Sequence, residues 1–329
     1  MGDVAIDQGA FGKRLKLLYE SWKGNRSSLW EDSGALGVVV GSTSEDLRYL
    51  KSISLHLWLF GYELPDTVLV FTEKEVHVLT SQKKANLLQP LKDACQSSAG
   101  ASLVIHVKAK GDDGGTAMGA MLDAAKEQAG GELKLGHLPK DQHQGALAGL
   151  WAQRIASAPG VECADVSGGF ADLFGCKDET EVLNVKKAAF LAGKAIEQLW
   201  FAARPRWLGA GQMVVVRRGG GLRRGARPGR WLVMGFVVER VEETIDQEKK
   251  VKHSKLSEMV EGVVTEPTKI GVKLRAENCD IAYPPVFQSG GRFDLKLSAS
   301  SDDTNLAQEG VITVALGTRY GSYCANIAR

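Results

Sequence analysis

No hydrophobic run in these 329 residues approaches the roughly 20 residues that a transmembrane helix needs. The N-terminal stretch is amphipathic and lacks the apolar core and cleavage site of a secretory signal. These two absences predict an intracellular protein with no membrane partner.

Paired cysteines and the common catalytic motifs are missing as well. The five cysteines form no CxxC pair, which argues against a disulfide framework and against a zinc site. We expect each of them to be a small buried hydrophobic residue: Cys95, Cys163, Cys176, Cys279 and Cys324. There is no GxSxG elbow, Walker loop, HExxH motif or strand-linked GxGxxG, so none of those enzyme classes is indicated.

Acidic and imidazole side chains are absent from the last stretch of the chain, residues 311–329. Apolar and β-branched residues up to Leu316, then Gly317, then an aromatic-rich run from Tyr320 to Ile327 predict two strands joined by a tight turn. Divalent cations need carboxylate or imidazole donors, so this hairpin cannot hold a metal ion by itself.

The composition that remains is that of a soluble globular protein, with 44% hydrophobic and 24% charged residues and enough length for two domains. The net charge of +2 conceals eight arginines between residues 198 and 238, where no lysine or acid occurs. Without them the net charge is 2 − 8 = −6, so the rest of the chain is mildly acidic and suits a basic partner.

Strand and helix patterns alternate through residues 1–175, which predicts a helix-covered α/β domain. The apolar run 35–40 is typical of a strand covered on both faces. Further strands are expected at 66–71, 75–79, 102–107, 133–138 and 161–166, and a turn at 170–174. Helices are expected at 11–31, at 81–92 with Ser81 as cap, at 116–128, at 145–156, and after Ser44 with Leu47, Leu50, Ile53 and Leu57 on the inner face.

Longer helical patterns begin at Glu179, and the composition shifts near Gly175, so we place a second domain at 176–329. Helices are expected at 181–198 and 237–264, the latter broken near His253, followed by strand-like sequence at 280–300 with Tyr283-Pro284-Pro285 and Gly290-Gly291 as turns. The histidines in apolar runs are expected to pack in or near the core, namely His56, His77 and His106. The other three are expected to be exposed, namely His137, His143 and His253.

An arginine- and glycine-rich segment at about 197–232 interrupts the second domain. Its composition predicts a loop that does not pack. It is either a nucleic-acid or nuclear-import patch or an insert that the fold tolerates. The sequence leaves both interpretations open.

Four blocks of the chain carry a family resemblance: residues 55–91, residues 242–256, YPPVFQSGG at 283–291, and GVITVALGTRYGSYCANIAR at the end. On these blocks the chain closely resembles the N-terminal domain of the large subunit of the FACT histone chaperone. The resemblance implies an α/β lobe like that of creatinase and prolidase, followed by an α+β pita-bread lobe of the aminopeptidase type, here C-terminally incomplete.

The resemblance also implies that catalysis has been lost. Active peptidases of this fold carry one metal-binding Asp in an Asp-Ala-Gly context and a second in an Asp-Ile-Thr-Arg context. Aligning Gly317 and Ile327 with those motifs puts Ala315 and Asn326 at the two ligand positions. The family's other ligands, a His and two Glu, lie further along the fold than Arg329. We therefore expect no catalytic residue, no metal and no cofactor.

By resemblance, the expected function is a nuclear, chromosome-associated module that binds core histones or nucleosomes during transcription, replication and repair. The smaller HMG-box-associated FACT subunit is the second implied partner, through regions outside this chain. Candidate histone- or peptide-binding residues are Ser81, Lys83, Lys84, Tyr283, Gln288, Ser289, Arg319 and Tyr323. A metal-dependent aminopeptidase or prolidase, and a truncated non-functional product, are the alternatives.

Overall fold

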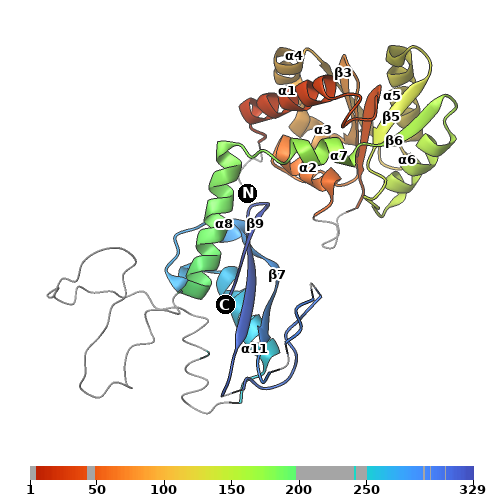
Figure 1. Ribbon diagram of the computed structural model, residues 1–329. Helices are drawn as coiled ribbons and strands as arrows, with labels where there is room; N and C mark the ends of the chain where they lie inside the picture. The colour runs from red at the N-terminus through yellow and green to blue at the C-terminus, as the bar shows by residue number, and fades with distance from the viewer. Residues whose placement is uncertain are drawn as a thin grey trace, which may run out of the picture. The chain divides into compact units, whose positions relative to one another are not determined.

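The computed structural model describes residues 5–42, 49–197, 241, 250–291, 293–296, 298–307 and 309–329. They belong to two compact units, Met1–Cys176 and Lys177–Arg329 (Figure 1). The expected cap at Ser44, nearly all of the arginine-rich segment and residues 242–249 of the expected long helix lie outside the described residues. Among the helices described, none has the length and hydrophobicity to span a bilayer.

The first unit contains a mixed six-stranded sheet and eight helical segments within its described residues. In chain order they are α1 (Gln8–Gly24), β1 (Ala35–Val40), α2 (Lys51–Phe60), β2 (Thr67–Phe71), β3 (Glu75–Ser81), α3 (Gln82–Leu88), the 3₁₀ turn η2 (Gln89–Leu91), α4 (Lys92–Ala99), β4 (Ser102–Lys108), α5 (Gly115–Ala129), β5 (Leu133–His137), α6 (Ala146–Ser157), β6 (Val161–Asp165) and α7 (Ser167–Leu173).

The strand order of this sheet is β4-β3-β2-β1-β5-β6. Strand β2 is antiparallel to both of its neighbours, β1 and β3, and β2 and β3 form a hairpin. The pairs β3–β4, β1–β5 and β5–β6 are parallel. The hairpin expected around residues 72–74 is therefore confirmed. The sheet is mixed because β2 runs antiparallel to the other strands.

Helices cover both faces of the sheet, as the apolar strand β1 predicts (Figure 1). Leu36 and Val38 point into a cluster with α1, α2, α4 and α7, whereas Ala35 points into a cluster with α5 and α6. Gly37 lies between them, where a Cβ would stand 2.9 Å from the ring of Trp151. The glycine therefore allows α6 to pack directly on the strand.

Several expected boundaries in the first unit are wrong. The helix α1 ends at Gly24, and α2 begins only at Lys51, so Leu50 is its N-cap residue and not part of its inner face. The single helix expected from Ser81 is divided into α3, η2 and α4 around Pro90, because proline lacks the N–H that a continuous helix needs. The turn expected at 170–174 is mostly helix α7.

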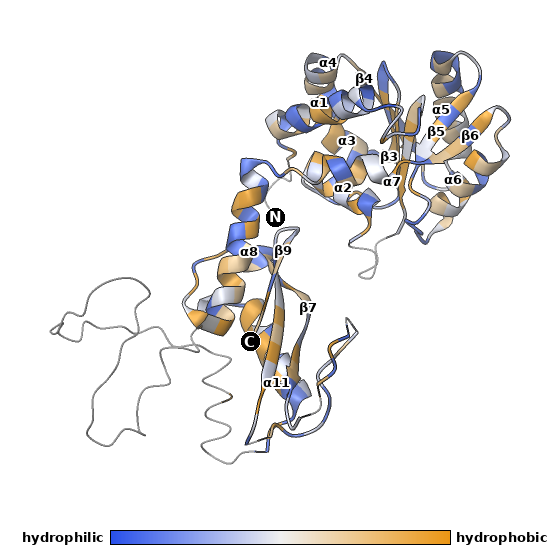
Figure 2. Ribbon diagram, viewed as in Figure 1, coloured by the Kyte–Doolittle hydropathy of each residue, from blue (hydrophilic) through white to orange (hydrophobic). Residues whose placement is uncertain are grey.

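The second unit is a three-stranded antiparallel sheet with helices on one face (Figure 1). Its described elements are α8 (Glu179–Glu197), α11 (His253–Val264), the 3₁₀ turns η3 (Pro267–Ile270) and η4 (Ala276–Asn278), β7 (Cys279–Gln288), β8 (Thr313–Tyr320) and β9 (Tyr323–Ala328). Val314, Leu316 and Tyr320 of β8 pack with Ala188 and Val260 of the helices. Figure 2 shows hydrophobic residues along most of α11.

Here too the structure corrects particular expectations. The terminal hairpin is confirmed, but its turn lies at Gly321, with φ +61°, and Gly317 is inside β8. Tyr283-Pro284-Pro285 is not a turn but a part of β7 where the pairing register shifts. His253, expected at the surface, is buried. Cys95 and Cys279 are buried as expected, whereas Cys163, Cys176 and Cys324 are exposed.

Candidate functional site: the outer sheet face

The face of the three-stranded sheet that points away from α8 and α11 is the candidate site, and we call it the outer sheet face. Because side chains alternate along a strand, the buried Leu316 and Thr318 fix the opposite orientation for their neighbours. The register of the three strands then assigns to this face Asp280, Tyr283, Val286 and Gln288 of β7, Thr313, Ala315, Gly317 and Arg319 of β8, and Cys324, Asn326 and Ala328 of β9.

The two positions aligned with metal ligands lie close together on this face. Ala315 pairs with Ala328, and Asn326 pairs with Gly317, two positions along the same strands. Ala315 is half-buried and Asn326 is exposed. A methyl group cannot ligate a metal, and a neutral amide cannot offset the charge of two cations. Within the described ranges no group of three or more His, Cys, Asp or Glu side chains is arranged to hold a metal ion.

Tyr283 covers the centre of the outer sheet face. It pairs with Gly317, and a Cβ built on that glycine would lie 2.3 Å from Tyr283 Cε1. The ring therefore rests on the glycine backbone, and partial burial raises the pKa of the Tyr283 phenol. The glycine and the tyrosine together make this part of the face flat and aromatic.

Arg319 and Gln288 are engaged within the chain. The guanidinium of Arg319 donates to Asp280 Oδ2 at 2.8 Å, which forms an ion pair across β7 and β8. Gln288 donates to the carbonyl of Asp294 at 3.0 Å and accepts from its N–H at 3.1 Å. The first pair joins two strands, and the second fixes the loop that follows β7.

Ser289 belongs to a hydrogen-bond chain that the sequence did not reveal, and the chain runs from the buried Ser289 and His253 to the exposed Asp302. Ser289 Oγ lies 2.8 Å from His253 Nε2, and His253 Nδ1 lies 2.6 Å from Asp302 Oδ1. Bonds from the Thr304 hydroxyl and then from His253 hold the pKa of Asp302 below its usual range. Because the carboxylate only accepts, His253 donates from Nδ1 to Asp302.

The order of groups is that of a serine–histidine–carboxylate relay, but Ser289 is 9% exposed and its Oγ also accepts from the Ala307 N–H at 2.9 Å. The chain joins the end of β7 and the 302–307 loop to the start of α11. Its signal in the sequence is faint, since the three residues are far apart and follow no motif spacing.

Tyr323 lies on the other side of the sheet. It pairs with the buried Tyr320, and its hydroxyl donates to Glu181 Oε1 of α8 at 2.9 Å. Tyr323 therefore joins β9 to the helix layer and does not belong to the outer sheet face.

Ser81, Lys83 and Lys84 lie in the first unit, at the start of α3. Ser81 occupies the N-cap position without a side-chain cap bond, and Ser81 and Lys83 are exposed. Lys84 donates to the carbonyl of Pro65. Burial lowers its pKa, and the carboxylate of Asp66 opposes that shift. The structure thus assigns the eight candidate residues to two separate units.

Solved structures of X-Pro aminopeptidases and prolidases share this fold. The X-Pro aminopeptidase from Thermotoga maritima matches 92% of this chain and 64% of its own, with a TM-score of 0.53 and 14% identity. At that identity the likeness concerns the fold alone. The protein is therefore of the peptidase-like class, with an α/β unit followed by a unit of pita-bread type, as the resemblance implied.

More similar proteins identify the family within that class. The family model for the FACT complex subunit SPT16 N-terminal lobe domain matches residues 6–169. The solved N-terminal domain of FACT complex subunit SPT16 from Cicer arietinum is 38% identical, has a TM-score of 0.82 and covers 99% of this chain and 67% of its own. FACT complex subunit SPT16 of Zea mays is 40% identical over 331 residues, which are 100% of this chain and 28% of that protein. The chain belongs to the family of the SPT16 N-terminal domain, and it spans about 28% of the length of that curated relative.

Proposed function

We propose that this chain is a non-catalytic, peptidase-shaped module of a FACT-type histone chaperone, which contacts core histones in the nucleus while chromatin is reorganised in transcription, replication and repair. The observation that supports the proposal is that Ala315 and Asn326 are neighbours on the outer sheet face, because the family resemblance aligns both positions with metal-binding carboxylates of the peptidases. A face that keeps the shape but lacks those carboxylates suits peptide binding without hydrolysis.

The outer sheet face has properties that fit an extended peptide. It presents a flat aromatic centre at Tyr283 and an exposed amide at Asn326, and its charged pair Arg319–Asp280 is neutral overall. Stacking and amide hydrogen bonds are the contacts that such a surface can make. The mildly acidic charge outside the arginine-rich segment would steer a basic histone tail toward the chain.

The absence of catalysis is tested directly by metal content and peptide hydrolysis. We expect no stoichiometric Mn²⁺, Co²⁺ or Zn²⁺ after incubation and gel filtration, and no cleavage of Xaa-Pro dipeptides. Two metal equivalents per chain, or dipeptide turnover that a chelator abolishes, would establish the prolidase alternative.

Histone binding is tested by capture of purified core histones on the immobilised chain. Asn326→Arg adds a positive charge to the outer sheet face, so it should weaken capture at least about threefold by repulsion from a basic tail. Gln153→Arg makes the same change at an exposed position of α6 in the first unit, and it controls for non-specific charge effects.

Deletion of residues 197–232 separates the arginine-rich segment from the rest of the chain. The proposal expects that capture of core histones survives this deletion. Equal losses in the two arginine variants, or complete loss on deletion, would contradict histone binding by the outer sheet face. The smaller HMG-box-associated subunit remains a proposed partner of regions outside this chain.

A further inference from the structure

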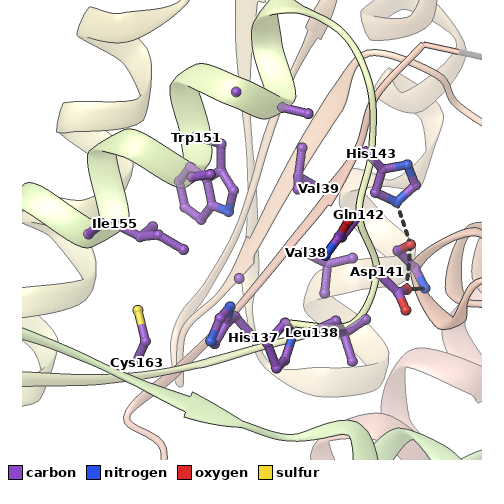
Figure 3. Close-up of a pocket in the computed structure, with 17 residues that line it drawn as sticks. Val38, Val39, His137, Leu138, Asp141, Gln142, His143, Trp151, Ile155 and Cys163 are labelled. Carbon is purple, nitrogen blue, oxygen red and sulfur yellow. Dashed lines mark hydrogen bonds between the residues drawn. The ribbon is translucent and has the colours of Figure 1, made fainter.

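A cavity of about 530 Å³ lies in the first unit beside β1 and β5 (Figure 3). These neighbouring strands are parallel, and the helices that follow them, α2 and α6, pack on opposite faces of the sheet. In open α/β sheets, such a divergence leaves a crevice at the carboxyl ends of the strands where ligands bind. The volume lies within the range of roughly 300–1,000 Å³ that is typical of small-molecule sites.

One end of the cavity is apolar and the other is polar. Leu138, Trp151 and Ile155 belong to the apolar walls, and Figure 3 shows Asp141 and His143 together at the other end. Asp141 Oδ2 accepts from both the backbone N–H and the hydroxyl of Ser52, each at 2.7 Å. The carboxylate thereby occupies the N-terminus of α2, where helix N–H groups favour an anion.

The hydrogen bonds also settle the protonation of His143. Since the single hydroxyl proton of Ser52 goes to Asp141, His143 Nε2 must donate its proton to Ser52 Oγ, 2.7 Å away. Burial lowers the pKa of the His143 imidazole, and Asp141 opposes that shift. Burial likewise lowers the pKa of His137, on the cavity wall. Both rings are therefore neutral near pH 7.

The charge balance of the cavity then selects its ligand. Among the described residues that line it, Asp141 is the acid and there is no Lys or Arg. Its Oδ1 has no hydrogen-bond partner in the described part of the chain. Phosphates and carboxylates would meet a like charge at the helix end that ordinarily attracts them. An ammonium group would instead complete the hydrogen bonding of Asp141.

We propose that this cavity binds a small organic cation, a primary alkyl- or arylalkyl-ammonium whose charged group bonds to Asp141 and whose apolar body packs against Trp151, Leu138 and Ile155. The site is distinct from the outer sheet face and does not depend on histone binding.

Cys163 provides the readout, because it is an exposed thiol on the cavity wall. Its alkylation by iodoacetamide, followed by mass spectrometry of the peptides that contain each cysteine, should slow at least about fivefold with millimolar phenethylamine. The exposed thiols Cys176 and Cys324, which do not line the cavity, are internal controls and should react at unchanged rates. The neutral 2-phenylethanol and the anionic phenylacetate share the apolar body, and neither should protect Cys163.

The variant Asp141→Asn keeps the shape of the side chain and an oxygen for Ser52, but removes the charge. Protection by phenethylamine should weaken about tenfold or more, as expected for a lost charge-assisted hydrogen bond. If this variant does not fold, as judged by its melting curve, the comparison of the amine, the alcohol and the acid on the native chain tests whether the cavity selects a cation.

Three results would overturn the proposal. They are no protection by the amine, equal protection by the alcohol or the acid, and protection of Cys163 by a lysine-containing tetrapeptide while free phenethylamine has no effect. The last result would assign the cavity to a peptide instead of a small cation.

Discussion

Single side chains decide what the outer sheet face can do. Ala315 and Asn326 offer a methyl group and a neutral amide at the two positions that the family resemblance aligns with metal-binding carboxylates. The polar groups nearby are largely used within the chain, since Arg319 bonds to Asp280 and Ser289 to His253. If the outer sheet face binds a partner as proposed, we expect shape and exposed amides to contribute more than unpaired charge.

Replacement of Gly317 tests whether the ring of Tyr283 packs against the backbone of β8. Because a Cβ there would stand 2.3 Å from Tyr283 Cε1, Gly317→Ala must displace the ring or part β7 from β8. We expect a loss of about 1–3 kcal/mol in the free energy of unfolding of the second unit, as for other overpacked sites. Urea unfolding, with hydrogen exchange of β7 and β8 peptides, measures it.

Gly262→Ala is the matched control in the same unit. It lies in α11, where an added Cβ meets nothing within 4 Å, so it should leave stability unchanged or raise it by about 0.5–1 kcal/mol. The double change Gly317→Ala with Tyr283→Ala should recover part of the loss. A neutral Gly317→Ala would mean that the ring does not rest on the glycine.

Residue roles were predictable only where the chain keeps a linear pattern. The sequence could place Ala315 and Asn326 on the two strands of one hairpin, and the register brings them together on the outer sheet face; their match to metal-ligand positions stays a prediction. The contacts of Ser289 were not predictable, since its partner His253 starts α11 and His253 in turn bonds to Asp302 in a separate loop. Partners of a hydroxyl depend on three-dimensional packing and leave no periodic trace.

At the scale of elements, strands were predicted more accurately than helix ends. The run 35–40 matches β1 because a buried strand needs continuous apolar sequence, and the run 102–107 matches the edge strand β4 to within one residue. Helix ends were predicted less accurately, since α2 begins after Leu50 without a side-chain cap. Its start is instead satisfied by Asp141, which lies 89 residues away from Ser52 in the sequence.

The contact between α8 and β8 depends on one buried hydrogen bond. Thr318 is fully buried, and its hydroxyl donates to the carbonyl of Ala188 in α8 at 2.8 Å. Thr318→Val keeps the shape and removes the donor, so it should cost about 1 kcal/mol of unfolding free energy. Thr313→Val, on the outer sheet face of the same strand, should be nearly neutral. Equal effects of the two changes in urea unfolding would show that the bond to α8 contributes nothing specific.

The two units differ in how many histidines they contain. Five of the six histidines lie in the first unit, and burial is the largest cause of a lowered pKa in each: His56, His77, His106, His137 and His143. The second unit has His253, which is bonded to Asp302. Acidification should therefore act on the two units unequally.

His56 shows in which direction a buried histidine makes the stability of the first unit change with pH. Complete burial lowers its pKa to about 3, whereas an unfolded histidine has a pKa of about 6.5. Between these values the unfolded state binds more protons, so stability is present above about pH 6.5 and is lost as the pH falls toward the folded pKa. For His56 alone the loss approaches about 1.4 kcal/mol per pH unit. The depressed pKa of Asp302 acts only at lower pH, as the carboxylate is protonated.

We therefore expect the first unit to open before the second as the pH is lowered from 6.5 to 5. Hydrogen exchange, corrected for intrinsic rates, should show β1 and β2 peptides losing protection while β8 and β9 peptides keep theirs. His56→Gln should flatten this dependence, and His106→Gln, at a half-exposed position of the edge strand β4, should flatten it less. Loss of protection in the second unit first, or in both units together, would show that buried histidines do not control the acid response.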